Sequence, residues 1–141
     1  MHKVVIDANV LVSAIFGGTS LKAVLKAFRK GRVVVSPQIE RELIELPEKL
    51  RRKLNPIQII EFKKLIRILF LKAERFQTKR RINISPHRED NAYLELCLAS
   101  GADYLITGDK DLLQIPQDKL KEIGLENLKI LTPSEFYRAE F

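Results

Sequence analysis

Short apolar runs, separated by stretches of helical pattern, are the feature of this sequence that most constrains its fold. The runs cover residues 4–6, 33–35, 104–106 and 128–131. They are too short for helices and do not alternate with polar residues, which is typical of strands buried in a parallel sheet. Since helical segments separate them and no tight hairpin turn is present, the sequence predicts a three-layer α/β/α sandwich with a mostly parallel, roughly five-stranded sheet.

The intervening segments carry the start and stop signals of helices. Asn55-Pro56 followed by Gln58 is a capping-box start. Gly31 and Gly101 each end a stretch with helical spacing. Helices are therefore expected over residues 21–30, after Ser36-Pro37, from Asn55, over about 90–100, over about 109–113 and from Thr132. Residues 81–84 are the candidate for a further short strand.

The length and the apolar runs indicate one soluble domain spanning residues 1–141. No run approaches the ~18 apolar residues of a membrane helix. The first residues lack the pattern of a signal peptide, so a cytoplasmic location is expected. Cys97 is the only cysteine, which excludes an internal disulfide and a cysteine-based zinc site.

Two acids directly follow predicted strands. Asp7 ends the run 4–6, and Asp109 comes shortly after the run 104–106. Ligands of parallel sheets bind at the carboxyl ends of the strands, where these two side chains are expected to meet. The alternative is that each acid caps a helix, or, for Asp7, forms a salt bridge; Asp111, two residues after Asp109, could point elsewhere.

Helical spacing adds two more acids to this candidate site. Asp90 shares a helix face with the apolar Leu94 and Cys97. After Ser36-Pro37, Glu42 lies on the inward stripe, whereas Glu40 falls to the side and is the alternative. Carboxylates gathered in one pocket repel one another unless a cation neutralises them. Their oxygen ligands suit Mg²⁺ or Mn²⁺, which can activate water for attack on a phosphate.

The motifs, taken in order, resemble the PIN-domain family. They are the segment 4–13 with Asp7 and Asn9, the segment 36–43 ending in Glu-Leu, and the block 90–113 with Asp90 and Asp109. The likeness is nearest to the branch of toxins of prokaryotic toxin–antitoxin pairs, related to the VapC ribonucleases. One departure is His87, which stands where relatives often carry a further acid.

The resemblance implies an Mg²⁺- or Mn²⁺-dependent endoribonuclease that acts on single-stranded RNA. It assigns the catalytic and metal-binding roles to Asp7, Glu42, Asp90 and Asp109. It implies a homodimer and an antitoxin protein as partner. Asn9 and Thr107 are expected to support the acids by hydrogen bonding, and Asp111 is placed with them as a neighbour of the site.

The charge of the chain suits such a substrate. Twenty-five Lys and Arg against eighteen Asp and Glu give a net charge of +7, which favours a polyanionic partner. Arg88 and Lys110 stand next to proposed ligands and are the candidates for phosphate contact. Base-stacking aromatics are not evident, so contact with the nucleic-acid backbone should dominate.

Two other functions fit the same pattern less well. A phosphatase or phosphoreceiver could use Asp7 as phosphate acceptor, but a phosphatase of the haloacid-dehalogenase type needs an Asp where Asn9 stands. A non-catalytic module could bind RNA or protein through the basic surface. The presence of all four acids argues against the second.

Overall fold

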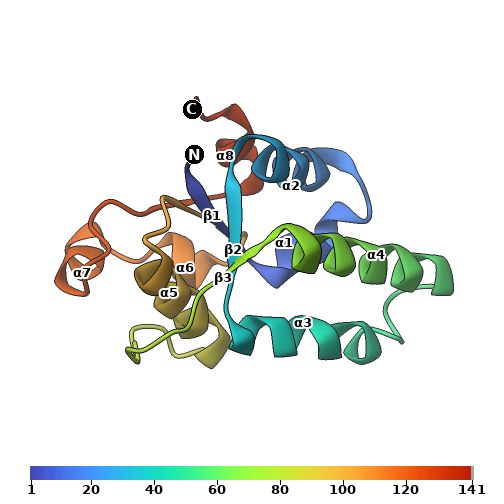
Figure 1. The fold of residues 1–141 in the computed structure, drawn as a ribbon, viewed down its shortest axis with the longest axis horizontal. Helices are drawn as coiled ribbons and strands as arrows, with labels where there is room; N and C mark the ends of the chain where they lie inside the picture. Colours follow the sequence, from blue (N-terminus) through green and yellow to red (C-terminus); the bar gives the residue numbers. More distant parts are fainter. Residues whose placement is uncertain (141) are drawn as a thin grey trace.

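The computed structural model describes residues 1–140, and a sheet of five parallel strands lies at its centre (Figure 1). All four strand pairings are parallel, and the strand order is β3-β2-β1-β4-β5. This order places β1 in the middle, beside β2 on one side and β4 on the other. The strands are β1 Lys3–Ile6, β2 Arg32–Val35, β3 Glu74–Arg75, β4 Tyr104–Ile106 and β5 Lys129–Leu131.

Helices cover both faces of the sheet. In Figure 1, α1, α2 and α4 lie on one side of the strands, and α5 and α7 lie on the other. This arrangement confirms the predicted α/β sandwich. The helices are α1 Ala8–Ala14, α2 Gly18–Lys30, α3 Pro37–Lys49, α4 Pro56–Lys72, α5 Arg88–Ser100, α6 Lys110–Leu113, α7 Gln117–Glu122 and α8 Pro133–Arg138.

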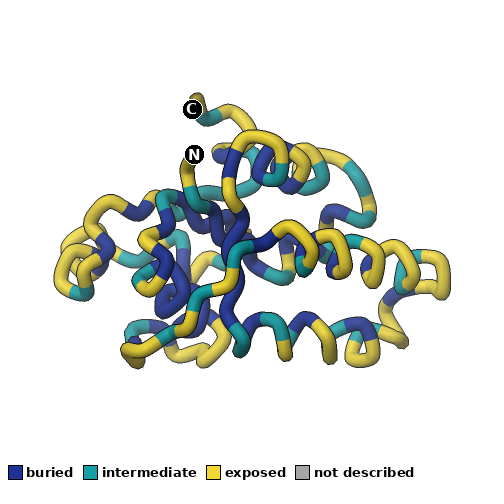
Figure 2. The backbone as a smooth tube through the Cα atoms, viewed as in Figure 1, coloured by how far each residue is buried: buried dark blue, intermediate teal, exposed yellow. Residues whose placement is uncertain are grey.

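The core forms where the apolar strands meet the helices, which Figure 2 shows as dark blue backbone at the centre. Val4, Val5 and Leu105 are at most 1% exposed, as expected for strands covered on both faces. In register, Val4 lies beside Tyr104 and Ile6 beside Ile106. β1 and β4 therefore end level with each other, which brings together the residues that follow them.

The predicted helix starts are present with their caps. Asn55 and Gln58 form a reciprocal capping box at α4, with bonds of 2.8 and 2.9 Å. Thr132 and Glu135 form a second one at α8. Each box satisfies backbone N–H groups that a helix start otherwise leaves without partners.

The predicted strand at residues 81–84 is wrong. The Ile82 N–H donates to Glu95 Oε2 at 2.9 Å, and the Ile84 N–H donates to Asn91 Oδ1 at 3.1 Å. Side chains of α5 thus take the place of a neighbouring strand for this backbone. The outer strand is β3, a two-residue element of charged residues whose pairing with β2 defines it.

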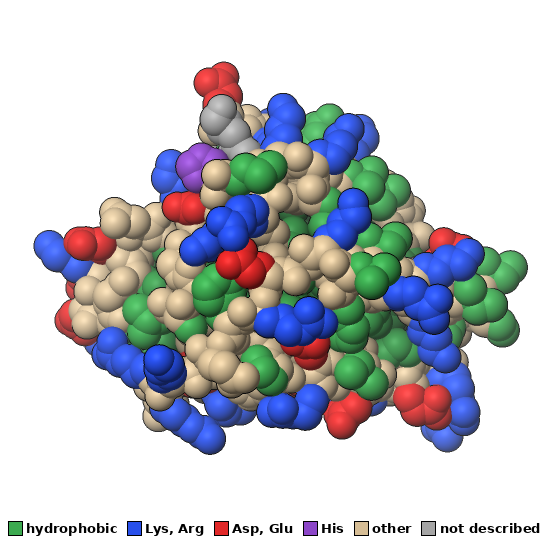
Figure 3. Space-filling view, in the orientation of Figure 1, with side chains coloured by type: hydrophobic (Ala, Val, Ile, Leu, Met, Phe, Trp, Pro, Cys, Tyr) green, Lys and Arg blue, Asp and Glu red, His purple; other side chains and the backbone are tan. Residues whose placement is uncertain are grey.

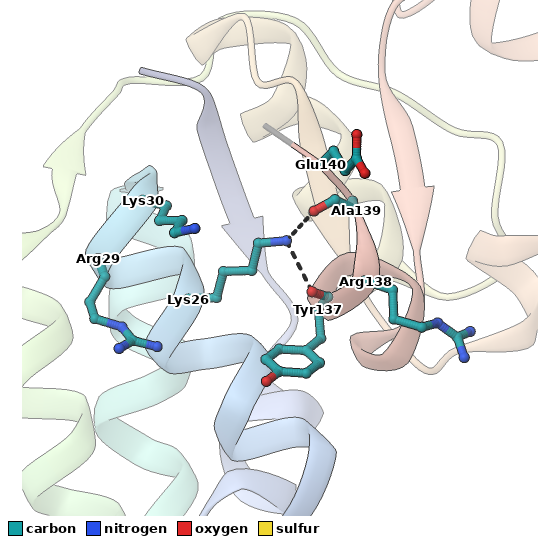
Figure 4. Close-up of a pocket in the computed structure, with 7 residues that line it drawn as sticks. All are labelled: Lys26, Arg29, Lys30, Tyr137, Arg138, Ala139 and Glu140. Carbon is teal, nitrogen blue, oxygen red and sulfur yellow. Dashed lines mark hydrogen bonds between the residues drawn. The ribbon is translucent and has the colours of Figure 1, made fainter.

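The last helix is fastened to α2 by a buried lysine. The Lys26 Nζ donates to the carbonyl oxygens of Phe136, at 2.7 Å, and of Tyr137, at 3.1 Å, and also to that of Ala139 (Figure 4). These carbonyls belong to the end of α8, where a positive charge also favours the helix dipole. A pocket of about 710 Å³ opens beside this contact, at the side of the molecule where both termini lie (Figure 1).

Within residues 1–140, no single helix has the length and apolar composition needed to cross a membrane. Helices α1 and α2 reach that length only as a pair, and they are bent by 115° where they join.

Candidate active site

Asp7 lies at the carboxyl end of the central strand, and both of its oxygens are held. Its backbone N–H donates to the Ile106 carbonyl at 3.0 Å, which continues the pairing of β1 with β4. Its Oδ1 accepts the Asn9 N–H at 3.0 Å, and its Oδ2 accepts the Thr107 hydroxyl at 2.7 Å. Asp7 is therefore both the cap of α1 and a fixed, buried carboxylate.

Thr107 joins the two strand ends. It is fully buried, and its Oγ1 also accepts the Asp109 N–H at 3.0 Å. One hydroxyl thus positions Asp7 through its proton and the backbone of Asp109 through its oxygen. The supporting role expected for Thr107 is served by its side chain, whereas Asn9 contributes its backbone N–H.

Three carboxylates converge beside Asp7. One oxygen each of Asp90, Asp109 and Asp111 can be chosen so that all three lie within 4.8 Å of one another. Asp90 is buried at the start of α5, and its Oδ2 accepts the Ser85 hydroxyl at 2.9 Å. Asp111 thus belongs to the same cluster as Asp90 and Asp109, although sequence reasoning placed it only among the supporting residues.

Glu42 reaches the same pocket from α3. The pocket has a volume of about 520 Å³ and is lined by Asp7, Glu42, Asp90 and Asp109 together with Glu89 and six other residues. Among the charged neighbours of Glu42, Glu89 contributes most to raising its pKa. Glu40, the alternative, bonds to the Arg75 Nε at 2.9 Å.

Burial and repulsion by neighbouring carboxylates raise the pKa values of Asp7, Glu42 and Asp90. Burial raises the pKa of Asp7, and Asp109 adds to that effect. Burial, followed by contact with Asp109, raises the pKa of Asp90 to about 6. Burial and then Glu89 raise the pKa of Glu42. The pocket thus gathers several carboxylates whose charged forms burial and mutual repulsion disfavour.

Tyr93 completes the floor of the pocket, and sequence reasoning did not single it out. Its hydroxyl oxygen accepts the Ala8 N–H at 2.9 Å. Burial raises the pKa of Tyr93, and Asp7 raises it further. Tyr93 lies one residue before Leu94 on the wholly buried part of α5, so its spacing alone resembled that of a core residue.

The two predicted phosphate contacts are both exposed, but only Arg88 is held by an ion pair to a buried acid. The Arg88 Nη1 bonds to the buried Glu95 Oε2 at 3.2 Å, which holds the guanidinium against α5. Lys110 is exposed on the short helix α6. Two basic side chains that were not proposed line the pocket itself, Lys49 and His87. The His87 Nε2 lies 3.1 Å from Asp111 Oδ2.

The donor set fits a hard divalent cation. The clustered groups are carboxylates, which are the oxygen ligands that Mg²⁺ and Mn²⁺ prefer. Burial and the neighbouring Asp109 raise the pKa values of Asp7 and Asp90, as expected for carboxylates that a bound cation would stabilise in their charged form. Asp90, Asp109 and Asp111 would hold such an ion, with Asp7 beside them.

Comparisons with known proteins agree with this architecture. One chain in the crystal structure of VapBC2 from Rickettsia felis has the same fold, with a TM-score of 0.56. That structure contains a DNA fragment from the VapBC2 promoter. The two chains are 15% identical, and the match covers 92% of this chain and 98% of that one. No curated protein matches the chain. The family model described as PIN domain matches residues 3–111. The chain belongs to the PIN-domain family.

Proposed function

We propose that this protein is a metal-dependent endoribonuclease that hydrolyses phosphodiester bonds of single-stranded RNA. The observation that carries the proposal is the set of convergent carboxylates at the carboxyl edge of the sheet, where Asp90, Asp109 and Asp111 approach within 4.8 Å. Membership of the PIN-domain family supports it, because nucleases are frequent in that family. The net charge of +7 favours an approaching polyanion.

Different residues of the pocket would have different roles in such a site. Asp90, Asp109 and Asp111 would bind Mg²⁺ or Mn²⁺, and Thr107 keeps Asp7 and Asp109 in register. A bound divalent cation lowers the pKa of water and stabilises the charge that develops on a phosphate under attack. Glu42, on the opposite wall of the pocket, is placed to accept a proton, because its raised pKa makes it a stronger base than an exposed glutamate.

The metal requirement gives a direct test of this proposal. Protein stripped with EDTA should leave a fluorescent single-stranded RNA intact, and cleavage should return on adding Mg²⁺ or Mn²⁺ to excess. The same titration should raise the melting temperature, because the ion binds only the folded carboxylate cluster. Cleavage that persists in EDTA would contradict the proposal.

A phosphoreceiver or phosphatase using Asp7 is the weaker alternative. Both oxygens of Asp7 already accept hydrogen bonds, from the Asn9 N–H and the Thr107 hydroxyl, and the side chain is only 4% exposed. An acceptor carboxylate needs an oxygen free to attack phosphorus. Stable labelling of Asp7 by acetyl phosphate would reverse this preference. A non-catalytic module would bind RNA without any metal-dependent cleavage.

A protein partner is also part of the proposal, and helix α4 offers a surface for it. Its buried side carries Phe62, Ile66 and Leu69. A second apolar row lies on the opposite side, and its four members are 43–80% exposed: Ile57, Ile60, Ile68 and Leu71. Lys63, Arg67 and Lys72 flank that row, and Lys64 lies within it, its Nζ 3.7 Å from Glu61 Oε1. Figure 3 shows apolar and basic side chains intermixed over this helix.

These features match a partner helix with an apolar stripe and acidic flanks. A second copy of α4 fits less well, because the basic flanks of two such helices would repel each other. The antitoxin implied by the family resemblance is the partner we propose for this surface. The homodimer and the cytoplasmic location stay predictions.

Charge and apolar substitutions on α4 test this surface separately. With a synthetic amphipathic helical peptide that carries an apolar stripe and acidic flanks as the probe, Ile60→Glu combined with Leu71→Glu should weaken binding at least about 100-fold. Lys63→Glu combined with Arg67→Glu should weaken it less and reduce its dependence on salt. Tyr137→Glu on α8 is the control and should bind normally. Unchanged binding by both pairs of substitutions would place the partner elsewhere.

A further inference from the structure

A second pocket adjoins the acidic pocket that Asp7, Glu42, Asp90 and Asp109 line. It has a volume of about 450 Å³ and is lined in part by Asn9 and Asp109, which also line the acidic pocket. From these two shared residues it runs between α1 and the start of α2. The two pockets are thus arms of one cleft across the carboxyl edge of the sheet, and Asn9 and Asp109 lie at their junction.

The walls of the second arm differ chemically from those of the first. Beyond Asp109, its polar side chains are the Asn9 amide and the Ser13 and Ser20 hydroxyls, and the remaining lining is Val10, Gly108 and Pro133. No lysine or arginine lines it among residues 1–140. Neutral donors and acceptors suit a sugar or a base rather than a phosphate, which basic groups would bind.

A tight turn gives this arm its shape. Gly17 and Gly18 have φ values of +83° and +69°, which side-chain-bearing residues rarely adopt. The turn bends α2 back by 115° from α1, so that Ser20 on the first turn of α2 lines the same pocket as Ser13 on α1. The two hydroxyls lie in one wall because the chain reverses between them.

We propose that this second arm is a nucleoside subsite that binds the ribose next to the scissile phosphate through its 2′-hydroxyl. This inference rests on the proposed nuclease function and specifies how its substrate is read. A 2′-hydroxyl both donates and accepts, as do serine hydroxyls and the asparagine amide, so each can satisfy the other. The subsite would make the cleft discriminate RNA from DNA at one nucleotide.

Chimeric oligonucleotides test the subsite. A single-stranded RNA with one mapped cleavage position is prepared with one 2′-deoxy nucleotide at each position in turn. For the wild type, kcat/KM should fall about 10-fold at one position flanking the cut. Ser13→Ala combined with Ser20→Ala should lose about 10-fold on the all-ribose substrate and become indifferent to the deoxy substitution at that position.

Thr19→Ala is the matched control, because it removes an exposed hydroxyl from the same turn of α2 outside the pocket. It should behave as the wild type. If the double serine variant is still as sensitive as the wild type to the deoxy substitution at that position, the proposed subsite is refuted.

Binding separates this result from failure of the proposed function. Asp109 lines both arms, so the cleavage-deficient protein for binding is Asp7→Asn, which leaves the serines in place. Fluorescence anisotropy with the same oligonucleotides should show the same single position of sensitivity. If the wild type binds with this position sensitivity but never cleaves, the proposed nuclease function is refuted and the subsite is supported. If every chimera binds equally, the subsite alone is refuted.

Discussion

Replacing Asp7 with asparagine should lower metal-dependent RNA cleavage by about 100-fold or more while leaving the fold intact. The substitution removes the charge of a carboxylate that lies beside the clustered aspartates but keeps its shape. An asparagine oxygen can still accept the Thr107 hydroxyl, and losing one acceptor for the Asn9 N–H should cost about 1 kcal/mol. Initial rates at saturating Mg²⁺ and a thermal melt measure the two effects.

Asp103→Asn provides the matched control for Asp7→Asn. Asp103 lies at the opposite end of β4, where its carboxylate accepts the Lys3 N–H at 2.9 Å. It is an acid at a strand end, but at the amino edge of the sheet, so its variant should cleave as the wild type does. Wild-type cleavage by Asp7→Asn, with contaminating nuclease excluded, would contradict the proposed function.

Asp90→Asn should have two opposite effects, stabilising the metal-free protein at neutral pH and abolishing cleavage. Burial and Asp109 raise the pKa of Asp90 from 3.8 to about 6. Such a difference corresponds to about 3 kcal/mol between the protonated and charged forms. Because the repulsion is shared with Asp109, we expect the substitution to add about 1–2 kcal/mol to the free energy of unfolding, or several degrees in melting temperature.

The pH dependence has a defined sign. Between about pH 4 and pH 6, the folded metal-free protein binds a proton at Asp90 that the unfolded chain does not. The contribution of this bound proton to the free energy of unfolding is therefore fully present below about pH 4. It is lost as the pH rises through about 6. Melting curves of the wild type should show this loss, and those of Asp90→Asn should show a smaller one, because Asp7 and Glu42 keep their raised pKa values.

Metal completes the comparison between the two proteins. Mg²⁺ or Mn²⁺ should restore stability to the wild type at neutral pH and have little effect on Asp90→Asn. Asp118→Asn, on exposed α7, is the control and should match the wild type throughout. A destabilised metal-free Asp90→Asn protein would mean that the charge at this position supports the fold.

The strands and most helices could be predicted because their signals are local. The runs at 4–6, 33–35 and 104–106 are strands in the structure, and the capping pattern at Asn55 starts α4. Helix α1 was not predicted, since its apolar residues continue directly from β1 and its cap, Asp7, was assigned to the site. β3 could not be predicted, because two charged residues form a strand only through their pairing with β2.

The site was predictable as far as it depends on strand ends and helix faces. Asp7, Asp90, Asp109 and Glu42 all line one pocket, and each stood at a position that local pattern singles out. Asp111 and Tyr93 did not stand out, since their places depend on how α5 and α6 pack against β1. The 4.8 Å cluster that includes Asp111 is a property of the assembled fold.

The bond from Thr107 to Asp7 joins residues 100 positions apart along the chain. During synthesis, Asp7 leaves the ribosome early, but its carboxylate gains the Thr107 hydroxyl only after β4 has emerged and paired with β1. The same delay applies to Asp109 and Asp111, which follow Thr107. A nascent chain therefore cannot assemble the acidic cluster until synthesis has passed residue 111 and β4 has paired with β1.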